Sequence, residues 1–272
     1  SLTEEGSLVL EPFCSSSTLV SLATRAERRV VSVSFNPLDA LRTRVALLTI
    51  PKRELDSALT RIADSPKAET TLREHVSRLY RTRCPHCGKE AQANYYVWER
   101  DEPLPNQTHF ACSACGESGL KASDDYDGQV LKEIPARGLH YWHILDRIVS
   151  EEGNARKLAA DLLELYTPRN LYVISNLILK VEALFSNSPL YDVFRLALLQ
   201  AMERGSKLNA VPGDPPAPHS TGLRPLQHHA EWNVWFLFEQ AARALGGQQP
   251  SRTVVLEAKP DKVVSSDARS GC

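Results

Sequence analysis

The chain has 272 residues, of which 42% are hydrophobic and 24% are charged, with a formal net charge of −1. This composition is ordinary for a globular protein that buries one large core or two smaller ones. The balanced charge excludes a global field that would hold the protein on nucleic acid or a membrane, so any nucleic-acid surface must be local. No apolar run reaches the roughly 20 residues that span a bilayer, and no secretory segment opens the chain. We therefore expect a cytoplasmic protein without a membrane partner.

Residues 1–50 alternate between β-prone and helical patterns. Strands are predicted at 8–10 and 30–33, and helices at 18–28 and 38–48, the second with Pro37 at its start. This order is that of a parallel β-α-β unit. Small residues between the first strand and the first helix let a ligand approach the backbone, which is typical of a nucleotide-cofactor site. Such units are common, so the spacing alone does not identify the ligand.

Residues 51–83 predict a helical connector, with helices at 51–63 and 69–80. Four arginines lie in its second part: Arg73, Arg78, Arg81 and Arg83. Guanidinium groups pair well with phosphate oxygens, so these side chains are candidates for contact with DNA. The alternative is a solvated helix face, because Glu74 and Glu90 dilute the positive charge.

Residues 84–130 contain two C-x-x-C-G turns, whose four cysteines are Cys84, Cys87, Cys112 and Cys115. Each turn directs two thiolates towards one point, and two such turns suit one tetrahedral zinc ion. The glycine after each second cysteine is expected to relieve crowding where the chain turns back. Four sulfurs leave no open coordination position, so the zinc would be structural and His86 an exposed flanking residue. The alternatives are two disulfides or four free thiols.

The segment between the two cysteine pairs supports a zinc ribbon. Residues 93–98 are aromatic and β-prone, as the hairpin of a ribbon requires. Residues 117–127 are acidic and predict a solvated loop or sheet edge. Cysteines at metal-binding spacing also fit a reducing cytoplasm.

Residues 131–250 predict an α-helical region. Thr167 and Pro168 have the pattern of an N-cap and a first helical residue, and apolar residues follow at helical spacing. Arg169 and Asn170, at this helix N-terminus, are candidates for contact with a base edge or a phosphate. The alternative is that Arg169 pairs inside the protein and Asn170 caps a turn.

Further helices are predicted at 190–204 and 231–245, separated by a proline-rich loop at 211–225. Two short strands are predicted at 254–256 and 263–264. We therefore expect residues 251–272 to return to the sheet of the first unit.

The first segment resembles a known cofactor signature. Residues 8–18 read LVLEPFCSSST, and the S-adenosylmethionine-binding signature of amino-group DNA methyltransferases typically reads VLDPFCGSGT. Residues 30–38, VVSVSFNPL, resemble the next strand of that family. Some of these enzymes carry a zinc ribbon followed by a T-P-R-N-L helix, and TPRNL stands here at 167–171. The segment EWNVW at 231–235 is similar to that subgroup as well, so the resemblance covers nearly the whole chain.

The resemblance implies an α/β fold in which a partial Rossmann-type methyltransferase unit is interrupted by a zinc ribbon and an α-helical recognition region. It implies that S-adenosylmethionine would be framed by Glu11, Pro12, Phe13, Cys14, Ser15, Ser17, Thr18, Ser34, Asn36 and Pro37. Ser15 and Ser17 replace glycines of the signature, and Ser34 replaces the acid that binds the ribose. We expect weak cofactor binding or none, because each lost or obstructed polar contact costs roughly 1–3 kcal/mol.

The catalytic loop of the family, D/N/S-P-P followed by an aromatic residue, has one candidate here, Asp214-Pro215-Pro216-Ala217. This segment lacks the aromatic residue and lies in the proline-rich loop, so we interpret it as a linker. No catalytic residue is assigned.

The resemblance thus implies a component or fragment of a site-specific DNA methyltransferase that acts on the exocyclic amino group of adenine or cytosine, within a restriction-modification or phage-defence system. It would bind double-stranded DNA and be inactive alone, either as a fragment, as one half of a split enzyme whose catalytic loop is on a separate chain, or as a decayed copy. The alternative is a non-catalytic, zinc-stabilised DNA-binding or scaffolding protein with a degenerate cofactor pocket.

Overall fold

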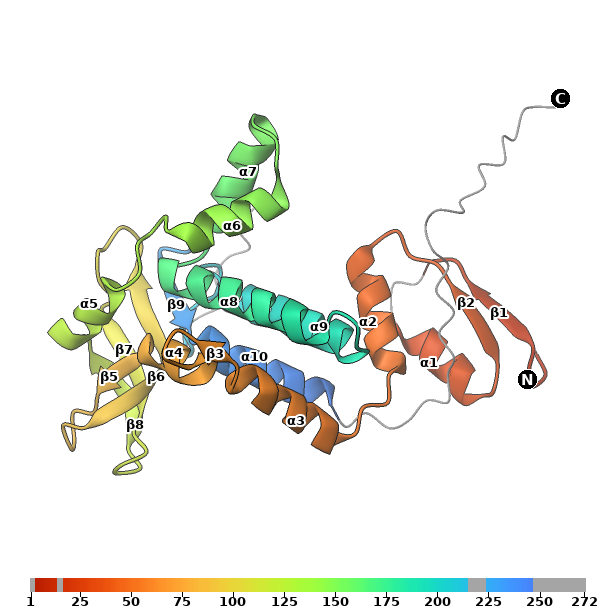
Figure 1. Ribbon diagram of the computed structural model, residues 1–272, viewed down its shortest axis with the longest axis horizontal. Coiled ribbons are helices and arrows are strands. Elements are labelled where there is room, and N and C mark those ends of the chain that lie inside the picture. The colour runs from red at the N-terminus through yellow and green to blue at the C-terminus, as the bar shows by residue number, and fades with distance from the viewer. Residues whose placement is uncertain (1–2, 14–16, 215–223, 247–272) are drawn as a thin grey trace. The chain divides into compact units, whose positions relative to one another are not determined.

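The computed structural model describes residues 3–13, 17–214 and 224–246, and its contacts divide the chain into two compact units (Figure 1). Among the described residues, the N-terminal unit ends at Thr49 and the main unit begins at Ile50. Both helices and strands are present, which confirms a mixed α/β protein. The strands predicted within 251–272 lie outside the described residues.

In the N-terminal unit, two parallel strands are joined by a helix. Its elements are β1 (Leu8–Glu11), α1 (Ser17–Arg25), β2 (Arg29–Ser32) and α2 (Pro37–Leu47). The strands pair from Leu8↔Arg29 to Glu11↔Ser32, which confirms the predicted parallel arrangement. Helix α1 is shorter than predicted because Glu27 takes a left-handed φ of 59°. The N–H of Arg28 then donates to the carbonyl of Ala23 at 2.9 Å, which closes the helix end.

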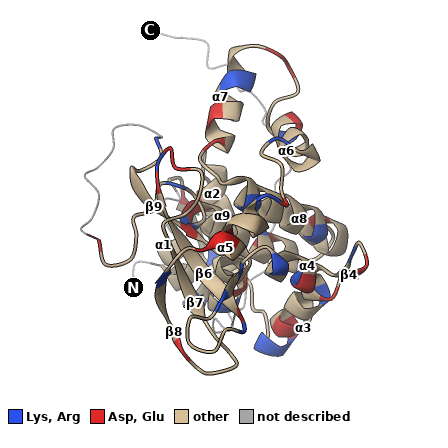
Figure 2. Cartoon of the chain, turned by 90° about the vertical axis from the view of Figure 1, so that its left-hand side faces the viewer, with Lys and Arg blue, Asp and Glu red and all other residues tan. Residues whose placement is uncertain are grey.

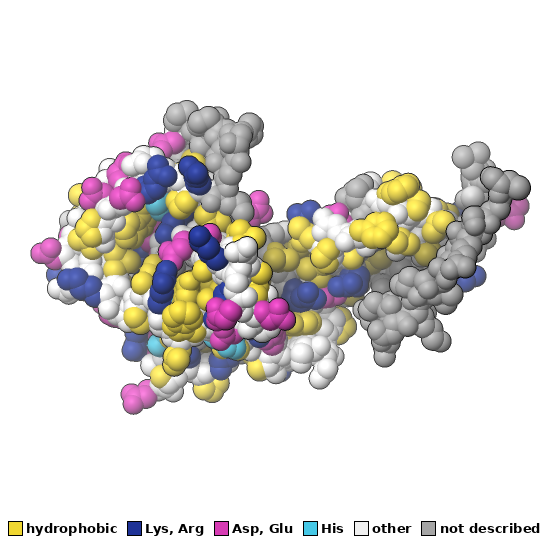
Figure 3. Space-filling view, turned by 90° about the horizontal axis from the view of Figure 1, so that it is seen from above, with side chains coloured by type: hydrophobic (Ala, Val, Ile, Leu, Met, Phe, Trp, Pro, Cys, Tyr) yellow, Lys and Arg dark blue, Asp and Glu magenta, His cyan; other side chains and the backbone are white. Residues whose placement is uncertain are grey.

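One face of the β1–β2 sheet is more exposed than the other. Residues along both strands alternate between exposed and half-buried positions, and α1 contacts both strands. Leu8 and Leu10 leave 60% and 64% of their surface exposed, and Val31 is exposed as well. Hydrophobic side chains are correspondingly visible on the surface of this unit (Figure 3). Because parallel sheets are normally covered on both faces, the described residues supply only one of the two layers.

The helical core of the main unit is built from α3 (Lys52–Ala63), α4 (Leu72–Arg78), α8 (Pro168–Phe185), α9 (Leu190–Arg204) and α10 (Val234–Leu245). Helix α9 packs along α8 and α10, and α3 packs against α10, so these helices run side by side in Figure 1. Phe194 lies in this core, with its ring centroid 4.9 Å from that of Phe185 and 5.9 Å from that of Phe238. The predicted helix at 190–204 is confirmed as α9.

The helix predicted at 69–80 is shorter in the structure. A small antiparallel hairpin, β3 (Pro66–Lys67) and β4 (Thr70–Thr71), precedes it. The hydroxyl of Thr71 then accepts a hydrogen bond from the N–H of Glu74 at 3.2 Å, so Thr71 is the N-cap and α4 begins only at Leu72.

An antiparallel sheet forms the other part of the main unit. Its strands are β5 (Arg81–Arg83), β6 (Glu90–Glu99), β7 (Gln107–Ala111), β8 (Ser118–Ala122) and β9 (His228–Trp232). The order is β5-β6-β7-β8, and β9 pairs with the C-terminal half of β6. A chain segment from beyond the helical region is therefore part of the sheet that carries the cysteines.

Two segments next to this sheet differ in part from their prediction. Residues 231–245 do not form one helix, because Glu231 and Trp232 belong to β9. The side chain of Asn233 caps α10 by accepting a hydrogen bond from the N–H of Phe236 at 3.2 Å, which separates strand from helix. The acidic segment 117–127, predicted as a solvated loop or sheet edge, contains the edge strand β8 and, unexpectedly, the start of α5 (Asp125–Leu131), which has a capping box between Asp124 and Asp127.

The remaining helices, α6 (Leu139–Ile148) and α7 (Asn154–Leu163), pack on each other and on the start of α8. They project from the helical core of the main unit (Figure 1). None of the helices in the described ranges has the length and apolarity needed to cross a membrane.

Candidate metal centre and adjoining buried network

The two C-x-x-C-G segments fold into matching turns. The N–H of Gly88 donates to the carbonyl of Cys84 at 3.0 Å, and that of Gly116 donates to the carbonyl of Cys112 at 2.9 Å. Both glycines take a left-handed backbone, with φ of 69° and 80°. A Cβ on either glycine would meet no atom within 4 Å, so the need is for positive φ and not, as expected, for relief of crowding.

These turns bring the four cysteine sulfurs together. The Sγ atoms of Cys84, Cys87, Cys112 and Cys115 all lie within 4.8 Å of one another. The sulfurs of Cys84 and Cys115 are 3.6 Å apart, as are those of Cys87 and Cys112. A tetrahedral zinc ion with Zn–S bonds of about 2.3 Å would separate its sulfurs by roughly 3.8 Å. The set therefore fits zinc, and it excludes disulfides because all four cysteines are free.

The thiols of the cluster differ in their pKa. Backbone N–H groups of Cys115 and Ala114 lower the pKa of the Cys112 thiol to about 7. The N–H of Glu117 also lowers the pKa of Cys115, but burial and the neighbouring thiols outweigh it and raise that pKa to about 12. Four thiolates at this separation repel one another, so a divalent cation is what would stabilise them together.

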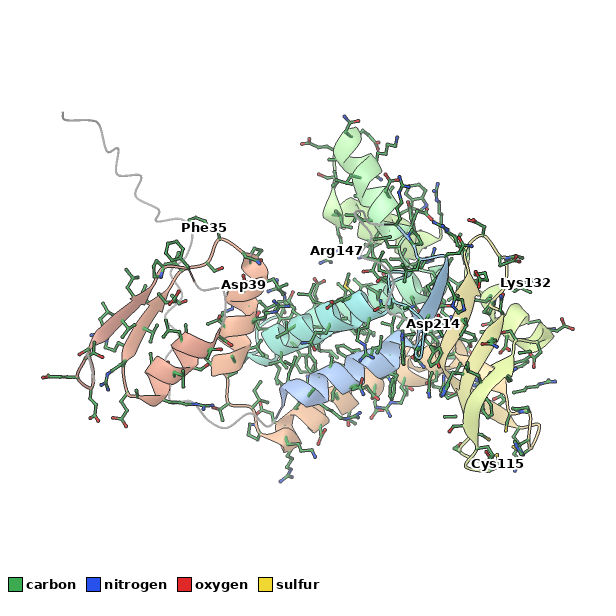
Figure 4. All side chains as sticks on the ribbon, turned by 180° about the vertical axis from the view of Figure 1, so that it is seen from behind. Phe35, Asp39, Cys115, Lys132, Arg147 and Asp214 are labelled. Carbon is green, nitrogen blue, oxygen red and sulfur yellow. The ribbon has the colours of Figure 1, made fainter. Side chains whose placement is uncertain are left out.

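The cluster lies at one end of the antiparallel sheet, where Figure 4 labels Cys115. Cys84 and Cys112 are buried against Ala91 and Phe110, whereas Cys87 and Cys115 are exposed. His86 is exposed and is not among the clustered ligands, as expected. Four sulfurs would fill the coordination sphere of a zinc ion, so the metal would have no open position for a substrate.

Three of the four arginines that precede the cysteines have an acidic partner. Arg73 pairs with Glu239 at 2.5 Å, Arg78 with Glu74 at 2.8 Å and Arg81 with Glu90 at 3.2 Å. Basic and acidic residues are accordingly interspersed on this unit (Figure 2). Arg83 differs, because its guanidinium lies 4.8 Å from the ring centroid of Tyr126 and has no acidic partner among the described residues.

Arg169 and Asn170 were candidates for contact with DNA, with internal pairing of Arg169 as the alternative, and the structure contradicts the contact and shows the internal pairing. Arg169 is 2% exposed and Asn170 is 0% exposed. The guanidinium of Arg169 donates to both carboxylate oxygens of Glu231, at 2.9 and 2.5 Å, and to the carbonyl of Leu79 at 3.0 Å. Both side chains are buried, so neither can reach a ligand in solution. The buried charge of Arg169 has in Glu231 the internal partner that such burial requires.

The partners of these two residues form one buried network. Glu231 also accepts from Thr167 at 2.5 Å and from the indole of Trp98 at 2.7 Å. The amide of Asn170 donates to the carbonyls of Gly205 and Trp232, and its oxygen accepts from Tyr80 at 2.7 Å. The network thus joins α8, β9, β6 and the residues after α4.

Burial controls the charge states in this network. It raises the pKa of Tyr80 and Tyr96, both of which face Arg169, so both phenols stay neutral. Burial alone would lower the pKa of Arg169, but the charge of Glu231 outweighs it and raises that pKa. Arg169 therefore stays charged, and Glu231, which the sequence did not single out for this role, is the acid that pairs with it.

The residues expected to frame a cofactor gather at one end of the parallel sheet. Glu11 ends β1, Pro12 and Phe13 follow it, and Ser17 and Thr18 begin α1, while Cys14 and Ser15 lie outside the described residues. Ser34, Asn36 and Pro37 follow β2 at the same end of the sheet.

Hydrogen bonds within these turns occupy several of their polar groups. A carboxylate oxygen of Glu11 accepts from the N–H of Phe13 at 3.2 Å. The hydroxyl of Ser34 accepts from the N–H of Asn36 and can donate to its carbonyl, both at 3.1 Å. Asn36 caps α2 by accepting from the N–H of Leu38 at 3.0 Å, and Pro37 follows as the first helical residue. Phe35 is 98% exposed and points away from the unit (Figure 4).

Asp214, the one described residue of the D-P-P-A segment, is engaged elsewhere. Its carboxylate accepts a hydrogen bond from the Nδ1 of His228 at 2.7 Å. The contact ties the segment to the start of β9, which fits the interpretation as a linker.

Comparisons with known proteins returned nothing: no protein-family model matches the chain, and neither does any curated protein or solved structure.

Proposed function

We propose that the chain is a component of a site-specific, S-adenosylmethionine-dependent DNA methyltransferase, to which it supplies a cofactor unit and a DNA-recognition region. The observation that carries the proposal is the order of three structural features along the chain. A parallel β-α-β unit is followed by a four-cysteine cluster and then by a helix that begins T-P-R-N-L, as the resemblance implies. The methyl group would go to the exocyclic amino group of adenine or cytosine.

Zinc is the metal we propose for the four cysteines. Cys84 and Cys87 would bind it from one turn, and Cys112 and Cys115 from the other. The ion would be structural, because it would join the turn after β5 to the turn after β7 and so hold the sheet together. A reducing cytoplasm would keep these sulfurs available for the metal.

DNA contact is proposed for the sheet surface near the metal. Arg83 is the leading residue, because its charge is not neutralised by an acid among the described residues and its aromatic contact orients it. Arg73, Arg78 and Arg81 would first have to leave their acidic partners, so we expect each to contribute less. Of the four arginines that the sequence offers as DNA contacts, we thus propose Arg83 as the main one.

The cofactor unit would place S-adenosylmethionine at the ends of β1 and β2, where Glu11 and Thr18 lie on either side of the connecting turn. The cofactor supplies the methyl group when it is bound. Ser34, whose hydroxyl is bonded to the backbone of Asn36, would be a poor partner for a ribose. Affinity is therefore expected to be weak in the isolated chain.

A second chain with a D-P-P-aromatic loop is proposed as the catalytic partner. The exposed residues Leu8, Leu10 and Val31 are consistent with this, since further strands and a helix layer of the same fold would cover them. The cofactor pocket would then be completed at the interface, which is why the chain alone would be inactive.

The test is calorimetric titration of the full chain with S-adenosylmethionine, alone and with a candidate partner chain. We expect weak binding alone and micromolar binding with the partner. DNA binding at two salt concentrations tests the recognition surface: Arg83→Gln should lower the salt slope by about 1, and Arg78→Gln, as the matched control, by less. An unchanged slope in Arg83→Gln would contradict the proposed contact.

A non-catalytic DNA-binding or scaffolding protein is the second candidate. The engagement of the Ser34 hydroxyl with the backbone favours it, because nothing at that position is left to hold a ribose. Salt-dependent DNA binding without any heat from millimolar S-adenosylmethionine, with or without partner, would select this function over the first.

A further inference from the structure

An open groove lies on the main unit where the start of α3 meets the end of α8 and the start of α9. Its volume is about 500 Å³, within the range of roughly 300–1,000 Å³ that small-molecule sites occupy. Polar side chains form its rim, namely Arg53, Glu54, Ser57, Arg61 and Ser188, and apolar ones form its floor, namely Ala58, Leu184, Phe185 and Leu190.

The spacing of the polar residues places them on one side of a helix. Arg53, Ser57 and Arg61 follow one another at intervals of four residues along α3, so their side chains lie in one row. Ser188 adds a hydroxyl from the loop before α9. Two guanidinium groups and two hydroxyls, all hydrogen-bond donors, therefore line the same groove.

The two arginines of the groove lack acidic partners among the described residues. Most other arginines of the main unit have one, as Arg73 has Glu239 and Arg147 has Glu182. The guanidinium of Arg61 lies 5.0 Å from the ring centroid of Phe185, which is itself buried. Stacking on a fixed ring orients the guanidinium and leaves its N–H groups available to a ligand.

Glu54 carries the opposite charge, but the net charge of the side chains that line the groove remains positive. Two arginines and one glutamate leave a net charge of +1, and Lys52 lies in the same helical turn. No side chain caps the start of α3, so the positive end of its dipole adds to the potential. Phosphate suits this donor set best, because guanidinium groups and hydroxyls match its oxygens in geometry and charge.

We propose that this groove is a phosphate-binding site, in which Arg53 and Arg61 bind the phosphate oxygens and the apolar floor contacts the remainder of the ligand. The phosphate belongs either to a free nucleotide-like ligand or to a DNA backbone. The inference does not depend on the methyltransferase proposal, since it rests only on residues of α3, α8, α9 and the loop between α8 and α9.

Titration calorimetry on the full, zinc-loaded chain tests it with two probes, inorganic pyrophosphate and a short DNA duplex. The variants are Arg53→Gln, Arg61→Gln and the double variant. The control is Arg137→Gln, which removes the same charge from an exposed arginine that pairs with Glu164 outside the groove. Each single variant should weaken pyrophosphate binding by about tenfold, and the double variant should abolish it.

The two probes separate the sources of phosphate. Loss of both pyrophosphate and duplex affinity in the double variant supports a site for the DNA backbone, and loss of pyrophosphate affinity alone supports a free ligand. Equal pyrophosphate affinity in the wild type, the double variant and Arg137→Gln overturns the proposal, as does failure of the wild type to bind pyrophosphate. Thermal unfolding of each variant checks that these exposed substitutions leave the fold intact.

Discussion

The two units of the chain bury their side chains very differently. Among the residues that the structure describes, all of the largest fully buried side chains lie in the main unit, including Tyr80, Arg169, Phe194 and Glu231. In the N-terminal unit, by contrast, Leu8, Leu10 and Phe35 leave more than half of their surface exposed. The main unit therefore has the internal contacts of an independent domain, whereas the described residues of the N-terminal unit cover only one face of its sheet.

This difference in burial follows from the type of sheet in each unit as well as from the size of the unit. The antiparallel sheet of the main unit needs only one covered face, and its long strand β6 is paired on both edges. The parallel pair β1–β2, which is the part of this sheet that the structure describes, has only four residues in each strand, and two strands alone are marginal in water. We infer that the main unit determines the stability of the chain.

Removal of the metal should produce the largest effect, and only in the main unit. We expect one zinc per chain, and we expect Cys112→Ser or a chelator to unfold the cysteine end of the sheet. Structural zinc supplies apparent free energies of about 10–16 kcal/mol in small zinc domains, more than most domains have in total. Metal analysis and thermal unfolding measure both quantities.

The control for the metal site is His86→Ala, an exposed neighbour outside the ligand set. It should keep the zinc content and the unfolding temperature of the wild type. If Cys112→Ser melted as the wild type does, the four sulfurs would have no structural role.

Substitution of the buried arginine should give the second largest effect. Arg169→Met leaves Glu231 buried without its cation, which typically costs about 3–5 kcal/mol. Arg78→Met removes an exposed pair on the same unit and should cost about 0–1 kcal/mol. Denaturant unfolding of both variants gives the comparison directly.

A double variant sharpens this test. Replacing Arg169 and Glu231 together by apolar residues should recover part of the loss, because no unpaired charge then remains buried. Equal stability of Arg169→Met and Arg78→Met would contradict the buried network as a source of stability in the main unit.

The sequence predicted what local patterns control and failed where distant segments meet. The C-x-x-C-G turns, the cap at Thr167 and the parallel order of β1 and β2 depend on neighbouring residues, and they were predicted correctly. The role of Arg169 depends on Glu231, 62 residues away, and no local pattern reveals that pairing. For the same reason the last two residues of β9, Glu231 and Trp232, were taken for helix: their partner strand β6 lies far away in the chain.

The arginines illustrate the same limit within one residue type. Arg73 and Arg81 look available in the sequence, but Glu239 and Glu90 neutralise them in the fold. Arg53 and Arg61, which have no acidic partner among the described residues, were not singled out although their four-residue spacing around Ser57 is visible in the sequence. A row of donors at helical spacing was the signal that could have found the groove.

The smallest effect is expected on the exposed face of the parallel sheet, where Leu10→Lys tests the contrast between the units most directly. A side chain with 64% of its surface exposed should change the unfolding free energy of the isolated chain by less than about 0.5 kcal/mol. The matched control is Leu55→Ala in the main unit, where the side chain is 1% exposed and the loss should be about 2–5 kcal/mol. A loss above about 1 kcal/mol in Leu10→Lys would mean that this face is already packed in the isolated chain, and the N-terminal unit would then need no partner to complete it. If Leu10→Lys instead leaves the unfolding free energy unchanged but abolishes binding of a catalytic partner chain, the partner binds to this face.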